Sequence, residues 1–396
     1  MGDLAEFRDE AREWLEENCP ESLRGPGQVL AGGRKQNIEN QDSLIWLERC
    51  AERGYTVPMW PTSYGGAGLS LAEFLVLLEE MRRIGARTPL AGMGTSMIGP
   101  TLLEFGTEDQ KLRHLPRIAS GEIRWCQGYS EPGAGSDLAS LQTRAEDKGD
   151  HFVVNGGKIW TSLAHFADWM FCLVRTDPKA PKHEGISFVL FPMEQPGMSV
   201  NPLPLISGVS HFCQCFFDDV IAQKDDLVGE INKGWTVGKR LLQHERSNIT
   251  TLAGAGAGLT PAERTLKELA HDYVGTDGGK VADADLRSRM ARHQITSRAF
   301  GLTQRRTVEE SESGNTPGFT TSIFKLYGAN LRKETQELKL RIMGHRALAW
   351  AEDGGFSSEE LEATRTWLFS KASSIAGGSN EVQMNIIAKR VLGLPD

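Results

Sequence analysis

Near the C-terminus, two glycines and a serine precede a segment whose apolar residues recur at helical spacing. Gly377, Gly378 and Ser379 stand in SSIAGGSNEVQMNIIAKR, residues 373–390. Glycine tolerates positive φ and a closely approaching ligand, Ser379 or Asn380 can cap the helix, and helix N-terminal N–H groups favour an anion. The stretch therefore predicts a helix start that either only turns the chain or also contacts a bound ligand.

A second candidate is YSEPGAGSD, residues 129–137, which leaves the strand-like run WCQG and turns through Pro132, Gly133 and Gly135 to Ser136. Such a turn can bring backbone N–H groups and hydroxyls close to a ligand. The same residues also make an ordinary strand-to-loop turn. From these letters alone, both interpretations stay open.

A third candidate is NGGKIWTSLAHFADW, residues 155–169, where Trp160 stands beside Thr161 and Ser162 as a predicted strand ends. A flat aromatic side chain and two hydroxyl donors in one short segment fit a ring-shaped ligand. A tryptophan buried in the core is the alternative, and composition alone favours it.

One carboxylate interrupts an apolar stripe on the helix predicted over 233–252. Leu241, Glu245 and Ile249 follow one another at i, i+4 and i+8, so they share a helix face. A carboxylate there is costly unless it is paired, exposed or used, and desolvation would raise its pKa toward values useful for proton abstraction. The alternative is an ion pair with a cation such as Arg246.

The run GAGAG at 254–258 does not make a dinucleotide site. The phosphate-binding fingerprint needs a preceding strand, GxGxxG spacing and an acidic residue about twenty positions later. Here a helical segment precedes the run and the spacing differs. Close helix packing over small residues is the better interpretation.

Composition excludes several classes of protein. The 396 residues carry a formal net charge of −8 and no basic cluster, so we expect neither nucleic-acid nor anionic-lipid binding. The six cysteines lack CxxC spacing, which predicts buried thiols without disulfides or zinc. The first eighteen residues read as an amphipathic helix and not as a targeting signal, and no window is apolar enough to span a membrane. We expect a cytoplasmic protein.

The pattern of the chain changes twice. Helical periodicity dominates residues 1–122, short β-rich runs occupy 123–230, and helices return over 231–396. HFVVNG, WMFCLVRT, ISFVLFPM and CQCFFDDV are the predicted strands, whereas DYVGTDGGKVADAD and ESGNTPGFTT are predicted loops. These three ranges are the predicted domains of an α+β protein.

Together, SEPGAGSD and NGGKIWTS resemble motifs of the acyl-CoA dehydrogenase family of flavoproteins, and the likeness extends over essentially the whole chain. MWPTSYGGAGLS is similar to the family's N-terminal part, and IAGGSNEVQMNIIAKRVLGLP to its last helices. The resemblance implies an N-terminal helical domain, a central β-barrel-like domain and a C-terminal four-helix bundle. It also implies FAD at the edge of the β-domain, with an acyl-CoA thioester lying against the flavin.

In this family an α-proton passes to a protein base and a β-hydride to flavin N5. Hydrogen-bonding groups must therefore stabilise the reduced ring. Trp160 would pack on the ring, and the Tyr129 main chain would contact the polar edge of the ring. Arg341 would either reach the FAD pyrophosphate across an interface or remain a solvated helix residue. The positions that the resemblance assigns to the cofactor are Gln127, Tyr129, Ser130, Ser136, Trp160, Thr161, Ser162, Gln294, Arg341, Gly344, Ser379 and Glu381.

The base of this chain differs from the common family pattern. Many members carry a glutamate in the C-terminal motif, where this sequence has only Ala376 to Ser379. A branch of the family, including isovaleryl-CoA and long-chain types, carries its base on the mid-chain helix in an ER pair, matched here by Glu245 and Arg246. Gly377 would leave space for that carboxylate and its N–H would bond the thioester carbonyl. The substrate positions implied are Ser136, Arg246, Gly377 and Gly378.

Other departures concern the assembly. The family's Arg-x-x-Phe-Gly run, which reaches a neighbouring subunit's FAD, is replaced by AHDYVGTDGGK, and SRAFG at 297–301 comes too late to serve. We expect a homodimer or homotetramer, or a heteromer with a homologous chain, that passes electrons to an electron-transfer flavoprotein. The alternatives are a same-fold flavin oxidase or monooxygenase, or a non-catalytic partner subunit.

Overall fold

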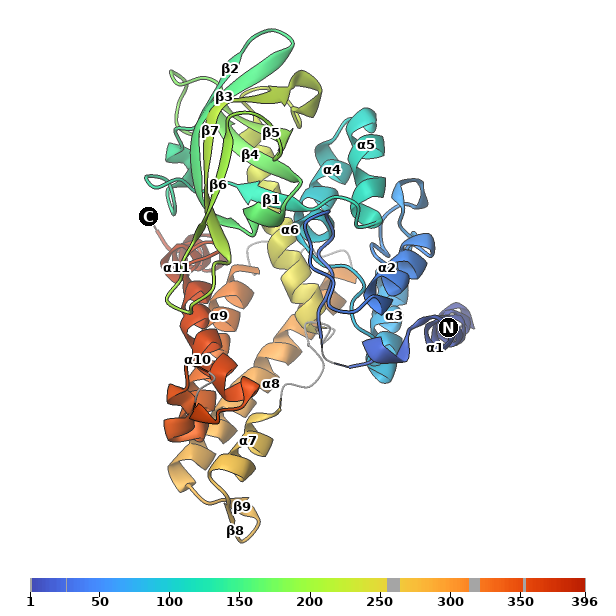
Figure 1. Cartoon of the computed structure of the whole chain (residues 1–396), viewed down its shortest axis with the longest axis vertical. Coiled ribbons are helices and arrows are strands. Elements are labelled where there is room, and N and C mark those ends of the chain that lie inside the picture. The colour runs from blue at the N-terminus through green and yellow to red at the C-terminus, as the bar shows by residue number, and fades with distance from the viewer. Residues whose placement is uncertain (1, 26, 255–263, 313–320, 352–353, 396) are drawn as a thin grey trace. The chain divides into compact units, whose positions relative to one another are not determined.

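The computed structural model describes residues 2–25, 27–254, 264–312, 321–351 and 354–395, with side chains except at 2–3, 245–254 and 308–312 (Figure 1). The chain divides into two compact units. The N-terminal unit comprises Met1–Leu203 and Ser210–Glu245, and the C-terminal unit comprises Pro204–Val209 and Arg246–Asp396.

Helices open the N-terminal unit, as predicted. They are α1 (Gly2–Asn18), α2 (Asp42–Glu52), α3 (Leu71–Ile84), α4 (Gly99–Phe105) and α5 (Glu108–Ala119). Ala11 and Leu15 of α1 are fully buried, which the helical spacing of its apolar residues anticipates. Ser70 and Thr107 start α3 and α5 with capping boxes that satisfy the first free N–H groups.

Seven strands of the same unit form one curled sheet (Figure 1). They are β1 (Trp125–Gly128), β2 (Arg144–Asp147), β3 (His151–Ser162), β4 (Trp169–Arg175), β5 (Ile186–Pro192), β6 (Met198–Leu203) and β7 (Phe212–Gln223). Their order is β1-β4-β2-β3-β7-β6, with β5 paired to β4. The four predicted strands are confirmed as β3, β4, β5 and β7.

The core of the N-terminal unit lies on both faces of this sheet. Phe171 and Phe188 stack there with ring centroids 6.1 Å apart, and the buried ring of Tyr129 meets Phe171 edge-on. All six cysteines are free and buried, as predicted. Burial raises the pKa of the Cys215 thiol to about 12, so this sulfur stays protonated and unreactive.

Helix α6 (Gly234–Gly254) leads into the C-terminal helices α7 (Leu266–Tyr273), α8 (Ala284–Glu312), α9 (Thr321–Met343), α10 (Ser358–Ser370) and α11 (Asn380–Ile386). One predicted loop is wrong in part, because Thr276–Asp277 (β8) pairs with Lys280–Val281 (β9). Gly278 and Gly279 both have positive φ, the conformation that a two-residue hairpin turn requires. Most of the other predicted loop and the GAGAG run, apart from Gly254, lie outside the described residues.

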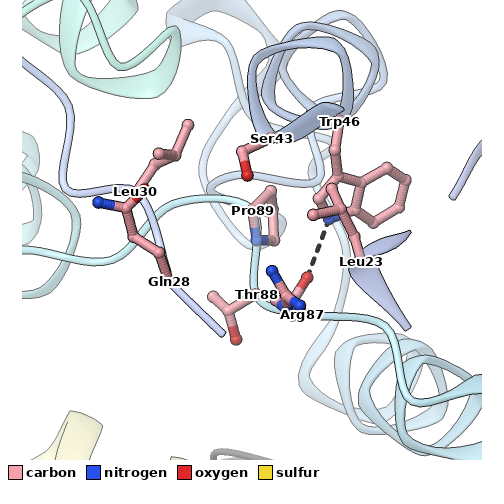
Figure 2. Close-up of a pocket in the computed structure, with 8 residues that line it drawn as sticks. All are labelled: Leu23, Gln28, Leu30, Ser43, Trp46, Arg87, Thr88 and Pro89. Atoms are coloured by element: carbon pink, nitrogen blue, oxygen red, sulfur yellow. Dashed lines mark hydrogen bonds between the residues drawn. The ribbon is translucent and has the colours of Figure 1, made fainter. Parts of the chain in front are cut away.

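One small cavity lies among the N-terminal helices, lined by residues that include Leu23, Leu30, Trp46 and Pro89 (Figure 2). The Trp46 indole N–H donates to the Arg87 carbonyl at 2.9 Å. The space suffices for about one water molecule, so it cannot hold a cofactor. Among the described residues, no helix is long and apolar enough to cross a membrane, and no cluster of His, Cys, Asp and Glu could hold a metal ion.

Candidate active site

The structure brings two of the sequence motifs together on the sheet. The Ile159 N–H donates to the Ser130 carbonyl at 2.8 Å, so Ser130 lies beside the residue that precedes Trp160. A β-bulge interrupts the pairing of β3 with β7 between Lys158 and Thr161. This irregularity lets Trp160 adopt φ 60° and point outward, with 55% of its surface exposed. The alternative of a core tryptophan is therefore wrong.

Trp160 is an aromatic surface held in an unusual conformation. The ring of Phe212 meets it edge-on at 6.1 Å. Positive φ in a bulky residue costs of order 1–3 kcal/mol and persists where the surrounding structure enforces it, commonly at ligand sites. An exposed, braced aromatic ring on a sheet is suited to stacking against a flat ligand.

Two polar side chains of the predicted site have buried polar atoms without a regular hydrogen bond among the described residues. Gln127 Nε2, on β1, is buried without a hydrogen-bond acceptor among the described residues. Among the described residues, the buried hydroxyl of Thr161 forms no regular hydrogen bond, but it interacts with the weakly polar Cys215 thiol. Because an unmet buried donor costs about 1–3 kcal/mol, a bound ligand or an ordered water is expected to supply the partner. These residues fit a flat, polar-edged ring such as that of FAD.

The loop from Tyr129 to Asp137 carries further predicted residues. Ser136 is exposed, whereas the Tyr129 side chain is buried and its hydroxyl donates to the Gly238 carbonyl at 3.4 Å. Gly133 and Gly135 lack positive φ, and a Cβ on either would meet nothing within 4 Å. Neither strain nor internal crowding requires glycine there, and the open space beside the backbone is compatible with the close approach of a ligand.

The side chains of α6 are described up to His244, directly before the predicted base. Leu241 is fully buried in the core, as the apolar stripe predicts. His244 Nε2 lies 3.2 Å from Glu104 Oε2. Burial lowers the pKa of His244, and the positive charge of Arg240 lowers it further. The side chains of Glu245 and Arg246 lie outside the described residues. Their assignment as base and substrate contact stays a prediction.

Positive φ angles and side-chain hydrogen bonds hold the C-terminal glycine turn in a defined conformation. Gly377 and Gly378 have φ values of 66° and 90°, and the Ser379 hydroxyl caps α11 by accepting from the Val382 N–H at 3.4 Å. The buried side chain of Gln383 donates to the Gly377 carbonyl at 3.2 Å and to the Gly378 carbonyl at 3.5 Å. Gln383 therefore fixes a turn that the sequence assigned to the glycines alone.

The remaining predicted residues are exposed in the C-terminal unit. Gln294 lies on α8, Arg341 near the end of α9, Gly344 directly after α9 with φ 56°, and Glu381 in the first turn of α11. Within the described part of this unit, no hydrogen bond or ion pair joins Gln294 or Arg341 to the glycine turn. Backbone N–H and the Ser379 hydroxyl lower the pKa of Glu381. Its carboxylate is therefore held at the helix start.

Sequence reasoning missed two residues inside the motifs that it singled out. Glu131 belongs to SEPGAGSD and Lys158 to NGGKIW, and they form an ion pair of 2.7 Å in which Lys158 is fully buried. The sequence did offer a signal for this ion pair, because each motif contains a charged residue besides the glycines, hydroxyls and tryptophan that were considered.

Comparison with known proteins agrees with this architecture. Models of the acyl-CoA dehydrogenase N-terminal, middle and C-terminal domains match residues 2–122, 126–220 and 232–392. The chain belongs to the acyl-CoA dehydrogenase family and is an oxidoreductase that acts on acyl-CoA.

Three relatives illustrate the similarity. Acyl-CoA dehydrogenase IpdE1 of Mycobacterium tuberculosis is 38% identical over 400 residues, which span 100% of this chain and 99% of that protein. A solved structure described as the Tcur3481-Tcur3483 steroid ACAD is 31% identical with a TM-score of 0.76, covering 100% of this chain and 98% of that one. The ChsE4-ChsE5 complex from Mycobacterium tuberculosis is 30% identical with the same TM-score and coverage.

Proposed function

We propose that this protein is an FAD-dependent acyl-CoA dehydrogenase that converts an acyl-CoA thioester to the trans-2-enoyl-CoA. The observation that carries the proposal is the buried Gln127 Nε2, which has no hydrogen-bond partner among the described residues and lies on a strand that contacts the strand of Trp160. A flavin ring stacked on Trp160 would offer acceptor atoms to such a donor. The hydroxyls of Ser130 and Ser162 and the Tyr129 main chain are the other groups assigned to its polar edge.

The chemistry of the chain's own residues is a proton abstraction. When bound, FAD would supply the hydride acceptor. The Glu245 carboxylate would take the α-proton, and the Gly377 N–H would donate to the thioester carbonyl, which stabilises the negative charge that develops there. The exposed Ser136 would contact the CoA arm, with Arg246 and Gly378 completing the substrate contacts.

The acyl group and the partners are inferred from the relatives. Because one solved relative is described as a steroid ACAD, we infer a bulky, ring-bearing acyl chain. A solved two-chain relative, ChsE4-ChsE5, supports assembly with a homologous chain, with a homo-oligomer as the alternative. An electron-transfer flavoprotein would be the physiological oxidant.

The test is to purify the protein, record its flavin absorbance and add acyl-CoA thioesters without oxygen. We expect bound flavin that ring-bearing thioesters bleach faster than straight-chain ones do. Purified protein that neither carries nor takes up flavin would contradict the proposal. Fast reoxidation by air after bleaching would instead identify an oxidase or monooxygenase.

A further inference from the structure

A buried ion pair joins the two motifs of the proposed flavin surface. Lys158 Nζ lies 2.7 Å from Glu131 Oε1 and donates to the Tyr129 carbonyl at 3.0 Å. Lys158 is 0% exposed and Glu131 8% exposed. Because desolvation of two charges offsets much of their attraction, a buried pair is weak evidence of a stabilising role and needs another explanation.

The carboxylate of the pair also closes a loop. Glu131 accepts from the backbone N–H of Gln142 at 2.6 Å and of Thr143 at 3.0 Å, so one side chain fastens both ends of the segment 131–143. Burial alone would raise the pKa of Glu131, but Lys158 and these N–H donors lower it below its usual value. The carboxylate is therefore charged at neutral pH.

A second buried cation holds the same loop farther along. Arg175, at the end of β4, donates to the Ala139 carbonyl at 2.7 Å and to the Leu141 carbonyl at 3.4 Å. It also bonds the carbonyls of Lys182 and Glu184 at 3.2 and 2.9 Å. The segment that displays Ser136 thus rests on two buried positive charges.

We propose that Glu131 and Lys158 are positioning residues, which preform the loop that presents Ser136 and hold Ser130 beside Trp160. This inference rests on the proposed flavin and acyl-CoA site. The ion pair contacts the proposed site only through backbone groups. Lys158 donates to the Tyr129 carbonyl, and the N–H of the following residue, Ile159, donates to the Ser130 carbonyl. Neither charged group needs to touch the ligand.

The test compares Lys158→Met and the double variant Glu131→Gln/Lys158→Met with a matched control. Glu80→Gln is that control, because Glu80 is also buried and ion-paired, with Arg8, Arg12 and Arg83, in the helical part of the same unit. Lys158→Met leaves a buried carboxylate without its cation. The double variant removes both charges, so it keeps the test valid where the single variant fails to fold.

Three quantities are measured on folded protein. They are FAD affinity by fluorescence titration of the apoprotein, hydrogen–deuterium exchange of the loop 131–143 without FAD, and KM and kcat with a reactive acyl-CoA. Since misplacement of about 1 Å at a reacting site can cost about 100-fold, we expect at least tenfold weaker FAD binding or higher KM in the Lys158 variants. We also expect faster exchange of the loop, with none of these changes in Glu80→Gln.

Wild-type FAD affinity, loop exchange and KM in a folded Lys158 variant would overturn the positioning role. The same changes in Glu80→Gln would also overturn it, because they would reflect general destabilisation. Failure of the proposed function is a separate result, in which the wild-type protein itself neither binds FAD nor reacts with acyl-CoA.

Discussion

Substitution of Gly378 by alanine is the sharpest structural perturbation of the C-terminal turn. The residue has φ 90°, which costs an L-amino acid about 1–2 kcal/mol. The added Cβ would also lie 2.5 Å from Gln383 Nε2, so that amide must move and lose its 3.2 Å bond to the Gly377 carbonyl. That bond contributes about 0.5–1.5 kcal/mol, and the buried amide left without it costs about 1 kcal/mol more.

The sum predicts that Gly378→Ala destabilises the turn and the start of α11 by about 2.5–4.5 kcal/mol. At 1.4 kcal/mol per factor of ten, local opening becomes roughly 60- to 1,600-fold more frequent. Hydrogen–deuterium exchange of the α11 amides, followed by mass spectrometry, measures this opening directly. Catalytic activity is expected to fall as well, because the proposed thioester contact of Gly377 lies in the same turn.

Gly278→Ala is the matched control, because Gly278 has φ 55° and a Cβ there would meet nothing within 4 Å. This substitution also places alanine at a positive φ, but it does so in the β8–β9 hairpin and does not affect Gln383. The α11 amides should exchange at the wild-type rate in this control. Equal α11 exchange in Gly378→Ala and Gly278→Ala would refute the role assigned to Gln383 and the glycine turn.

Two further predictions concern stability. Phe171→Ala removes a fully buried ring and should lower the free energy of unfolding by about 3–5 kcal/mol in urea titrations, whereas a loss below about 1 kcal/mol would contradict the core described here. In the C-terminal unit, hydrogen bonds from Arg346 lower the pKa of Glu360 from 4.5 to about 2. The charged Glu360 carboxylate therefore stabilises the folded protein above pH 4.5, and this stabilisation is lost as the pH falls toward 2. The melting temperature of Glu360→Gln should therefore lie below wild type at about pH 6 and approach it at about pH 3, and a constant gap would speak against this assignment.

Local sequence patterns predicted much of the secondary structure. Apolar periodicity located the helices, and runs of β-branched and aromatic residues located β3, β4, β5 and β7. Strand β2 reads RAED and pairs through its backbone, with only Ala145 buried, so no alternating pattern marks it. Strand β6 contains Pro202 and ends the sheet order, a place where proline is tolerated. The predicted domain boundaries at 122 and 230 stay predictions.

Site residues that lie within a recognisable sequence motif could be predicted. The letters of two motifs pointed to Ser130 and Trp160, and the backbone bond from Ile159 to Ser130 brings them together. The roles of Lys158 and Gln383 could not be predicted, because they come from burial and from partners that only the fold supplies. The exposure of Trp160 was likewise hidden, since the β-bulge that turns it outward leaves no mark in composition.

We propose that Glu245 abstracts the α-proton of an acyl-CoA thioester. The most direct measurement is the rate at which a reactive acyl-CoA bleaches the flavin of Glu245→Gln under anaerobic stopped flow, with the exposed Glu230→Gln as control. We expect Glu245→Gln to retain FAD and to lose at least about 100-fold in bleaching rate, while Glu230→Gln matches wild type. Bleaching of Glu245→Gln at a near wild-type rate would show that another group is the base.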